Sequence, residues 1–269
     1  MLKVTLDPGH STGANVGAAN GYREGTVMFY YAQELREALE AYEGVEVFVT
    51  RQAIDVDPDL DARGKMAVKT GSDVFLSLHS DASSRMDTRG VTVIRSLKRP
   101  DSVTLGKQLA NAVDDVLGCD KSPYSGNDDG VWTRAYPGHT NLDYYGVIRA
   151  AVTGANVKYA YLIEHSFHTN QTDCAQLDAS AIRARLAEAE AEAIAKYFGL
   201  AKKDGTSPVA GVSDSTQTGT VPAVDGAKAG NDAIYAVQAG AFRSRENAEA
   251  YAAKLKSKGV DCIIVEKEC

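Results

Sequence analysis

Long apolar runs are missing from this sequence of 269 residues. No stretch approaches the ~18 consecutive apolar residues that a membrane-spanning helix needs, so we expect no transmembrane segment. A strand-like run already begins at Lys3 and leaves no space for the charged and apolar regions of a secretion signal. We therefore expect synthesis in the cytoplasm without a signal peptide.

An excess of basic residues is also missing. The chain has 29 Lys and Arg against 36 Asp and Glu, which gives a formal net charge of -7. Duplex nucleic acid and anionic membrane surfaces attract basic proteins, so neither is an expected partner. Only four cysteines occur, and Cys119, Cys174, Cys262 and Cys269 lack the close pairing of structural zinc sites. Without a secretion signal, reduced thiols are the expected state.

What the sequence does contain is an alternation of strand and helix patterns. Apolar strand-like runs occur at 3–6, 45–50, 74–78, 91–94 and 160–164. Apolar stripes at helical spacing lie between them, within 28–42, 105–117 and 182–198. This order predicts an α/β fold with a twisted, mostly parallel sheet and helices on both of its faces.

The composition changes after about residue 200. Residues 201–232 are rich in Gly, Ser, Thr, Ala and Pro and predict a flexible linker. Residues 233–269 then show a strand, a helix and a strand at 234–240, 248–255 and 262–265. We thus expect a domain over 1–200 and a small C-terminal β-α-β segment, which is too short to bury a core unaided.

Three of the predicted strands end on a side chain that can bind metal or carry a proton. His10 follows the first strand, His79 the third and Glu164 the last. The carboxyl ends of parallel strands share one edge of a sheet, where ligands bind in open α/β folds. The residues therefore predict a site at this edge.

Two imidazoles and one carboxylate are an established ligand set for catalytic zinc. His10 and His79 supply the imidazoles, and Glu24 is the best-placed carboxylate, since it lies just before the first helix and the Gly-rich loop can fold it back. Glu34 and Glu37 lie further inside that helix, where we expect solvent around them.

Hydrolysis by a zinc enzyme also needs a base that does not bind the metal, and Glu164 fits that role. His165, the next residue, should face the opposite side of the sheet. His139 and His168 show no ligand-like spacing.

Each residue also has a structural interpretation. Histidines at strand ends often only donate hydrogen bonds, Glu24 in a first helical turn favours the helix dipole, and Glu164 could pair with an arginine. From the residues alone, a metal site and a structural role are about equally supported. A phosphate site at Gly9–Gly17 is a weaker alternative, because the loop lacks the Gly-Lys-Ser/Thr ending of a P-loop.

The chain resembles the zinc-dependent N-acetylmuramoyl-L-alanine amidases of the amidase 3 type from Val4 to about Leu200. The segments that carry the resemblance are Leu6-Asp7-Pro8-Gly9-His10, Glu24 before a helix, Val49-Thr50-Arg51, Leu60 with Arg63, Phe75-Leu76-Ser77-Leu78-His79-Ser80-Asp81-Ala82, Gly90-Val91, and Ile163-Glu164-His165-Ser166-Phe167-His168-Thr169-Asn170. The resemblance implies one catalytic zinc ion held by His10, Glu24 and His79, with Glu164 as the catalytic glutamate. Ser80-Asp81 and Ala67-Val68 depart from the family pattern, which leaves the metal unaffected but puts substrate contacts in doubt. Arg51 and Arg63 are expected to be structural.

Residues 233–269 resemble the first half of a SPOR peptidoglycan-binding repeat, through Tyr235-Ala236-Val237-Gln238-Ala239-Gly240 and the helix after it. A half-repeat could form a dimer to complete the fold. Together the two resemblances imply a peptidoglycan hydrolase that cleaves between N-acetylmuramic acid and L-alanine, as an endolysin or a sporulation or cell-wall autolysin acting after release. The alternatives are a catalytically inactive wall-binding protein and a zinc peptidase that cuts within the stem peptide.

Overall fold

The computed structural model describes residues 1–19, 21–122 and 129–203. The chain divides into two compact units, Met1–Val212 and Ser213–Cys269, and all described residues belong to the first. The predicted β-α-β segment and nearly all of the predicted linker lie outside the described residues, as do Cys262 and Cys269. Cys119 and Cys174 are buried free thiols, as expected.

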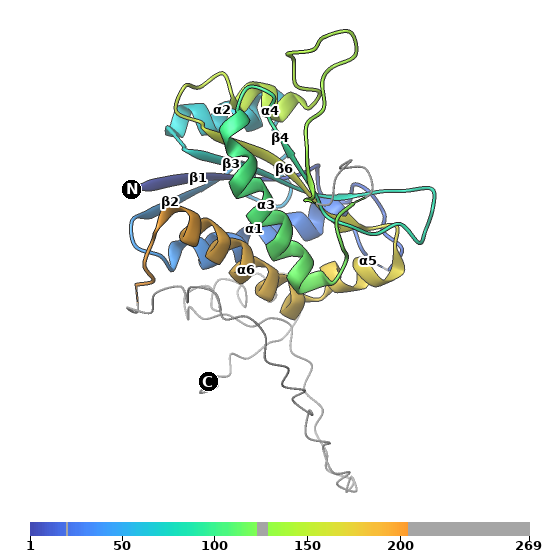
Figure 1. The fold of residues 1–269 in the computed structure, drawn as a ribbon. Coiled ribbons are helices and arrows are strands. Elements are labelled where there is room, and N and C mark those ends of the chain that lie inside the picture. Colours follow the sequence, from blue (N-terminus) through green and yellow to red (C-terminus); the bar gives the residue numbers. More distant parts are fainter. Residues whose placement is uncertain (20, 123–128, 204–269) are drawn as a thin grey trace, which may run out of the picture. The chain divides into compact units, whose positions relative to one another are not determined.

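A six-stranded sheet forms the centre of the first unit (Figure 1). Its strands are β1 (Leu2–Pro8), β2 (Val45–Val49), β3 (Val74–Asp81), β4 (Thr92–Arg95), β5 (Val131–Trp132) and β6 (Tyr159–Phe167). They lie in the order β2-β1-β3-β6-β4-β5, and only the β4–β6 pairing is antiparallel. The predicted mostly parallel sheet is therefore confirmed.

Helices cover both faces of the sheet (Figure 1). They are α1 (Glu24–Glu40), α2 (Leu60–Thr70), α3 (Val103–Leu117), α4 (Gly146–Ala151), α5 (Gln171–Asp178) and α6 (Ser180–Phe198), with a 3₁₀ turn at Pro100–Ser102. The apolar sides of α1, α3, α5 and α6 share one core with the sheet, and α2 and α4 contribute to a second core on the other face. The three predicted helices are α1, α3 and α6.

The helix α2 was not predicted, and packing explains why its sequence is a weak helix signal. Gly64 lowers helix propensity in its interior. A Cβ at Gly64 would lie 2.4 Å from the carbonyl oxygen of Val147 on α4. The close approach of α2 and α4 thus requires a residue that sequence patterns count against a helix.

The central strands place the predicted site residues along one edge. β1 pairs with β3 so that Pro8 is opposite Leu78, and β3 pairs with β6 so that His79 is opposite Glu164. The three strands run in parallel, so their carboxyl ends are neighbours. His10, His79 and Glu164 therefore come from adjacent strand ends, as expected.

Buried polar contacts beneath this edge hold its loops. Arg63 donates to Asp7 at 2.8 Å and to the carbonyl oxygen of His10 at 2.9 Å. Arg51 donates to the carbonyl oxygen of Gly25 at 2.6 Å and to the Thr12 hydroxyl at 3.1 Å. Both arginines thus have the predicted structural role, because Arg51 ties loops together and Arg63 ties loops and pairs with the buried Asp7.

Candidate metal centre

His10 lies in the turn that leaves β1, where its backbone is left-handed with φ 57°. Gly9 before it packs directly on His79, since a Cβ at Gly9 would lie 2.3 Å from Cε1 of that ring. The missing side chain lets the two imidazoles meet edge to face, with ring centroids 4.8 Å apart.

Glu24 is the first residue of α1 rather than a residue before it, and it is buried with only 1% of its surface exposed. Its backbone N–H donates to the carbonyl oxygen of Asn15, so the Gly-rich loop folds back as expected. At Gly25 a Cβ would lie 1.8 Å from the Ser11 carbonyl oxygen, so only glycine allows this loop to cross the start of the helix.

The three predicted metal ligands converge. Glu24 Oε2 lies 3.4 Å from His10 Nε2, and Glu24 Oε1 lies 3.2 Å from His79 Nδ1. All three candidate ligand atoms fall within 4.8 Å of one another. Glu34, by contrast, lies on another surface of α1, and the expectation that solvent surrounds it was wrong, because Arg183 on α6 donates to it at 3.1 Å.

The electrostatics of the cluster favour an ionised carboxylate. Burial opposes the charge of Glu24, but hydrogen bonds and charge interactions with His10 and His79 outweigh it and hold the pKa of Glu24 well below its usual range. The hydrogen bond to Glu24 raises the pKa of His10 in turn. A charged carboxylate beside two imidazoles is a suitable environment for a divalent cation.

A polar network behind Glu24 was not predicted. Asn15 Nδ2 donates to Glu24 Oε2 at 2.6 Å, and the Ser80 N–H donates to Oε1 at 3.0 Å. Ser80 Oγ is in turn hydrogen-bonded to Tyr22 OH at 2.8 Å and lies 3.0 Å from His168 Nδ1. These contacts fix the orientation of the Glu24 carboxylate.

His168 thus lies near the cluster, with its Nδ1 3.9 Å from Glu24 Oε2, although its spacing in the sequence gave no sign of this. Ser166 explains the difference, because its φ of 60° breaks the alternation at the end of β6. His139 is exposed, and its ring lies 6.0 Å from that of Tyr136.

Glu164 lies beside the cluster and has no arginine partner in the described part of the chain. Its Oε2 is buried without a hydrogen-bond partner there. Burial, reinforced by the charges of Asp81 and Glu24, raises its pKa well above the usual value. The side chain as a whole is half-buried, so one oxygen lacks a partner while the residue retains some exposure. A buried polar atom without a partner is costly, and perturbed acids of this kind cluster at functional sites.

His165 faces the other side of the sheet, as expected. It is fully buried, and its Nε2 lies 3.3 Å from Glu190 Oε2 on α6. Its Nδ1 donates to the carbonyl oxygen of His79 at 2.9 Å.

Comparison with known families agrees with this arrangement. The family model described as N-acetylmuramoyl-L-alanine amidase matches residues 4–196, and the SPOR domain model matches residues 227–267. No helix in the described residues is both long and apolar enough to cross a membrane.

Curated relatives are similar along the whole chain. The N-acetylmuramoyl-L-alanine amidase CwlM of Bacillus licheniformis is 26% identical over 273 residues, covering 100% of this chain and 86% of its own length. A sporulation-specific N-acetylmuramoyl-L-alanine amidase of Bacillus subtilis is 28% identical over 278 residues, with the same coverage.

Solved structures share the fold. The N-acetylmuramoyl-L-alanine amidase of Clostridium difficile 630 superposes with a TM-score of 0.59 at 21% identity, covering 74% of this chain and 97% of its own. Ami1 from Mycobacterium smegmatis gives 0.57 at 24% identity, with the same coverage. With the family model matched from residue 4 to residue 196, this chain belongs to the N-acetylmuramoyl-L-alanine amidase family.

Proposed function

We propose that the protein is a zinc-dependent peptidoglycan hydrolase that cleaves the amide between the lactyl group of N-acetylmuramic acid and L-alanine. The observation that carries this proposal is the convergence of His10, Glu24 and His79 beside Glu164, whose buried Oε2 has no hydrogen-bond partner in the described residues. Membership of the amidase family and the names of the two Bacillus relatives support the choice of bond.

The donor set fits zinc. Two imidazoles with one carboxylate leave a fourth position for water or substrate, as in other catalytic zinc sites. The low pKa of Glu24 provides the ionised ligand. When bound, zinc would polarise the scissile carbonyl and lower the pKa of water at the site.

Glu164 would move the proton. Its carboxylate accepts a proton from the attacking water and then donates it to the nitrogen of the departing amine. The surroundings of Glu164 suit the second step, because burial and the nearby acids Asp81 and Glu24 favour its protonated form. Glu164 thus serves as base and then as acid in one turnover.

The C-terminal part would hold the enzyme on its substrate. We propose that residues 1–200 form the catalytic domain, 201–232 a linker and 233–269 a partial SPOR-like segment that binds peptidoglycan. The SPOR match at 227–267 supports this role. Pairing of two such segments would make the protein a dimer, and the cell wall is its expected place of action.

Digestion of purified peptidoglycan tests the function directly. Mass spectrometry of the fragments should show new amino-terminal L-alanine, and this product should disappear after chelation and return with added zinc. Cleavage within the stem peptide would indicate a zinc peptidase instead. Sedimentation with walls without any cleavage would indicate an inactive binding protein.

A further inference from the structure

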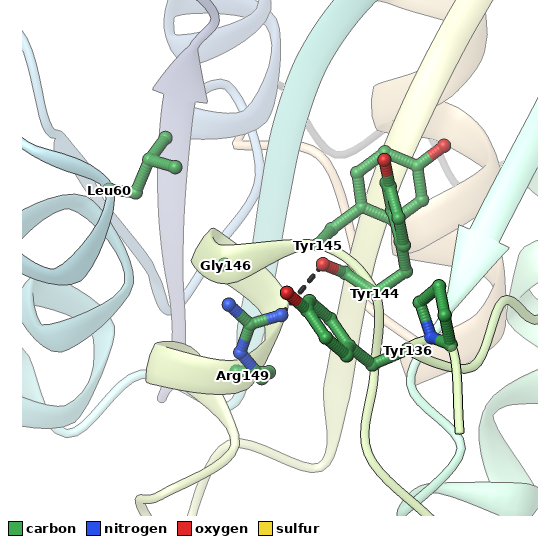
Figure 2. A pocket seen from close by; sticks show the side chains of 7 residues that line it. Leu60, Tyr136, Tyr144, Tyr145, Gly146 and Arg149 are labelled. Carbon is green, nitrogen blue, oxygen red and sulfur yellow. Dashed lines mark hydrogen bonds between the residues drawn. The ribbon is translucent and has the colours of Figure 1, made fainter. Parts of the chain in front are cut away.

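A pocket of about 480 Å³ opens beside the loop that precedes α4. It is lined by Leu60, Tyr136, Pro137, Tyr144, Tyr145, Gly146 and Arg149. In Figure 2, Leu60 of α2 lies on one side of the pocket and the three tyrosines lie on the other. Tyr136 and Tyr144 are 45% and 36% exposed, so large aromatic surfaces line an open cavity without being buried in the core.

Arg149 is fixed in this pocket before any ligand binds. Its Nη1 donates to the carbonyl oxygen of Asp143 at 2.8 Å. It also donates to the carbonyl oxygen of Tyr144 at 2.6 Å (Figure 2). Its guanidinium lies 5.6 Å from the centre of the Tyr136 ring. These contacts use Nη1 and hold the guanidinium plane in place, which lowers the entropy lost on binding an anion through its other donors.

A second guanidinium stands at the rim. Arg134 is exposed, and its Cζ lies 3.7 Å from the centre of the Tyr144 ring and 6.0 Å from that of Tyr145. Arg134 is also hydrogen-bonded to the Tyr145 side chain. Stacking on an aromatic face orients a guanidinium and leaves further N–H groups at its edge to bind a partner.

The pocket adjoins the proposed catalytic acid. Burial raises the pKa of Tyr145, Arg134 opposes that rise, and the charges of Glu164 and Asp81 add to it. Tyr145 lines the pocket and also packs against the buried cluster that contains Leu162, two residues before Glu164 on β6. A substrate whose scissile amide is beside Glu164 would extend into this cavity.

We propose that this pocket is the subsite for the stem peptide, in which Arg149 and Arg134 bind a free carboxylate of the peptide while the tyrosine rings pack on its apolar groups. The inference rests on the proposed function, because it takes the peptide side of the scissile amide as the occupant. None of the seven lining residues is acidic, whereas the proposed catalytic centre contains Glu24, Asp81 and Glu164. Two cations at the edge of an acidic centre in a chain of net charge -7 are suited to an anionic group.

Stem peptides carry such groups. The residue after L-alanine is a glutamate joined through its side chain, which leaves its α-carboxylate free, and a diamino acid that follows can carry another carboxylate. A neutral sugar offers no charge for the two arginines. The carboxylate therefore distinguishes the peptide side from the glycan side of the substrate.

Soluble muramoyl tripeptides test the proposal on the full-length, zinc-loaded protein. One substrate has both carboxylates free, a second is amidated at the glutamate α-carboxylate, and a third is amidated at the diamino acid. Loss of one charge-assisted contact should lower kcat/KM by about tenfold or more, mainly through KM, for one of the amidated substrates. The substrate that loses activity identifies the carboxylate that is bound.

Arginine variants complete the test. In the variants Arg149→Gln and Arg134→Gln, the ratio of kcat/KM for the free substrate to kcat/KM for the amidated substrate should fall toward one. Arg36→Gln, an exposed change on α1, should retain the full difference. Because Arg149 supports its loop, thermal unfolding of each variant is compared with that of the wild type, and exposed Arg134 gives the test that does not depend on the fold.

The outcomes are separable. If the wild type cleaves all three substrates equally, or if Arg134→Gln and Arg149→Gln retain the preference, the subsite proposal is wrong while the amidase function stands. Discrimination by changes in the sugar alone would assign the pocket to the glycan and overturn the proposal as well. If no muramoyl peptide is cleaved between the lactyl group and L-alanine, the proposed function itself fails.

Discussion

Glu164 on β6 is the register partner of His79 on β3. Partners on neighbouring strands project to the same face of a sheet, so a proposed metal ligand and the proposed base lie side by side on adjacent strands. The hydrogen bond from His165 to the His79 carbonyl oxygen ties the same two strands together. The spacing between ligand and base is therefore set by the pairing of β3 with β6.

Replacing the base without touching the ligands separates the two roles. Glu164→Gln should lower kcat about 10²- to 10⁴-fold, the usual contribution of a general acid and base, while zinc stoichiometry stays at that of the wild type. Muropeptide release and metal analysis measure the two effects. Glu192→Gln, an exposed change on α6, is the control, and a Glu164→Gln variant that retains full activity would contradict the assignment.

Sequence patterns predict the parts of this site that stand on strands. Buried parallel strands are continuous apolar runs, so the strand ends that bear His79 and Glu164 can be located from the amino-acid sequence. Glu24 followed from its position beside a glycine-rich loop and from the family resemblance. The sheet and the three long helices could be predicted equally well, because the apolar residues of each follow a clear pattern along the sequence.

Other features have no sequence period to show them. Asn15, which contacts Glu24, has a left-handed backbone with φ 52°, and His168 follows Ser166, which is also left-handed. The direction of neither side chain can therefore be predicted from the alternation of residues along a strand. β5 has only two residues and α4 only six, which is too short for a pattern. The pocket depends on the loop before α4, which is held by an isolated antiparallel bridge between Ala135 and Asp143 rather than by a regular strand or helix.

Glu24 should be the ligand whose charge the metal needs most. Glu24→Gln preserves the shape of the side chain but replaces an ionised oxygen with an amide, so zinc binding should weaken strongly. For the wild type, added zinc should raise the thermal midpoint, since a ligand that binds only the folded state stabilises it. An equal zinc-induced shift in Glu24→Gln would show that this carboxylate is not a ligand.

Asn15 tests the network behind the ligand. Removing a hydrogen-bond partner of a metal ligand typically costs about 10- to 100-fold in metal affinity, and Asn15→Gly removes the amide that donates to Glu24 Oε2. Glycine accepts the positive φ at this position, so the backbone should not change. Competition with a chromogenic chelator measures affinity, and unfolding of the metal-free variant shows whether the loop is intact. Unchanged affinity would mean that Ser80 alone orients the carboxylate.

Breaking the buried ion pair beneath the site should cost stability. Arg63 and Asp7 are each almost fully buried and lie 2.8 Å apart. Arg63→Met leaves the Asp7 carboxylate buried without its cation, which should lower the free energy of unfolding by about 3–5 kcal/mol. Arg36→Met, which removes an exposed pair with Glu40, should change it by less than about 1 kcal/mol. Urea unfolding of both variants gives the comparison, and similar losses would contradict a special role for the buried pair.

Substitution of Thr92 should lower activity without lowering stability. It is the register partner of Glu164 on the other neighbouring strand, β4, and its Oγ1 is buried without a hydrogen-bond partner in the described residues. The two orphan oxygens lie on one face of the sheet, so the Thr92 hydroxyl is placed to donate to Glu164, directly or through water, when substrate is bound. Thr92→Val keeps the shape and removes the hydroxyl, so kcat should fall about tenfold, as expected for one lost hydrogen bond to a charged group. Stability should stay the same or rise, because an unsatisfied buried hydroxyl is removed. Thr92→Ser, which retains the hydroxyl, should recover most of the activity, whereas a Thr92→Val enzyme as active as the wild type would show that Glu164 works without this donor.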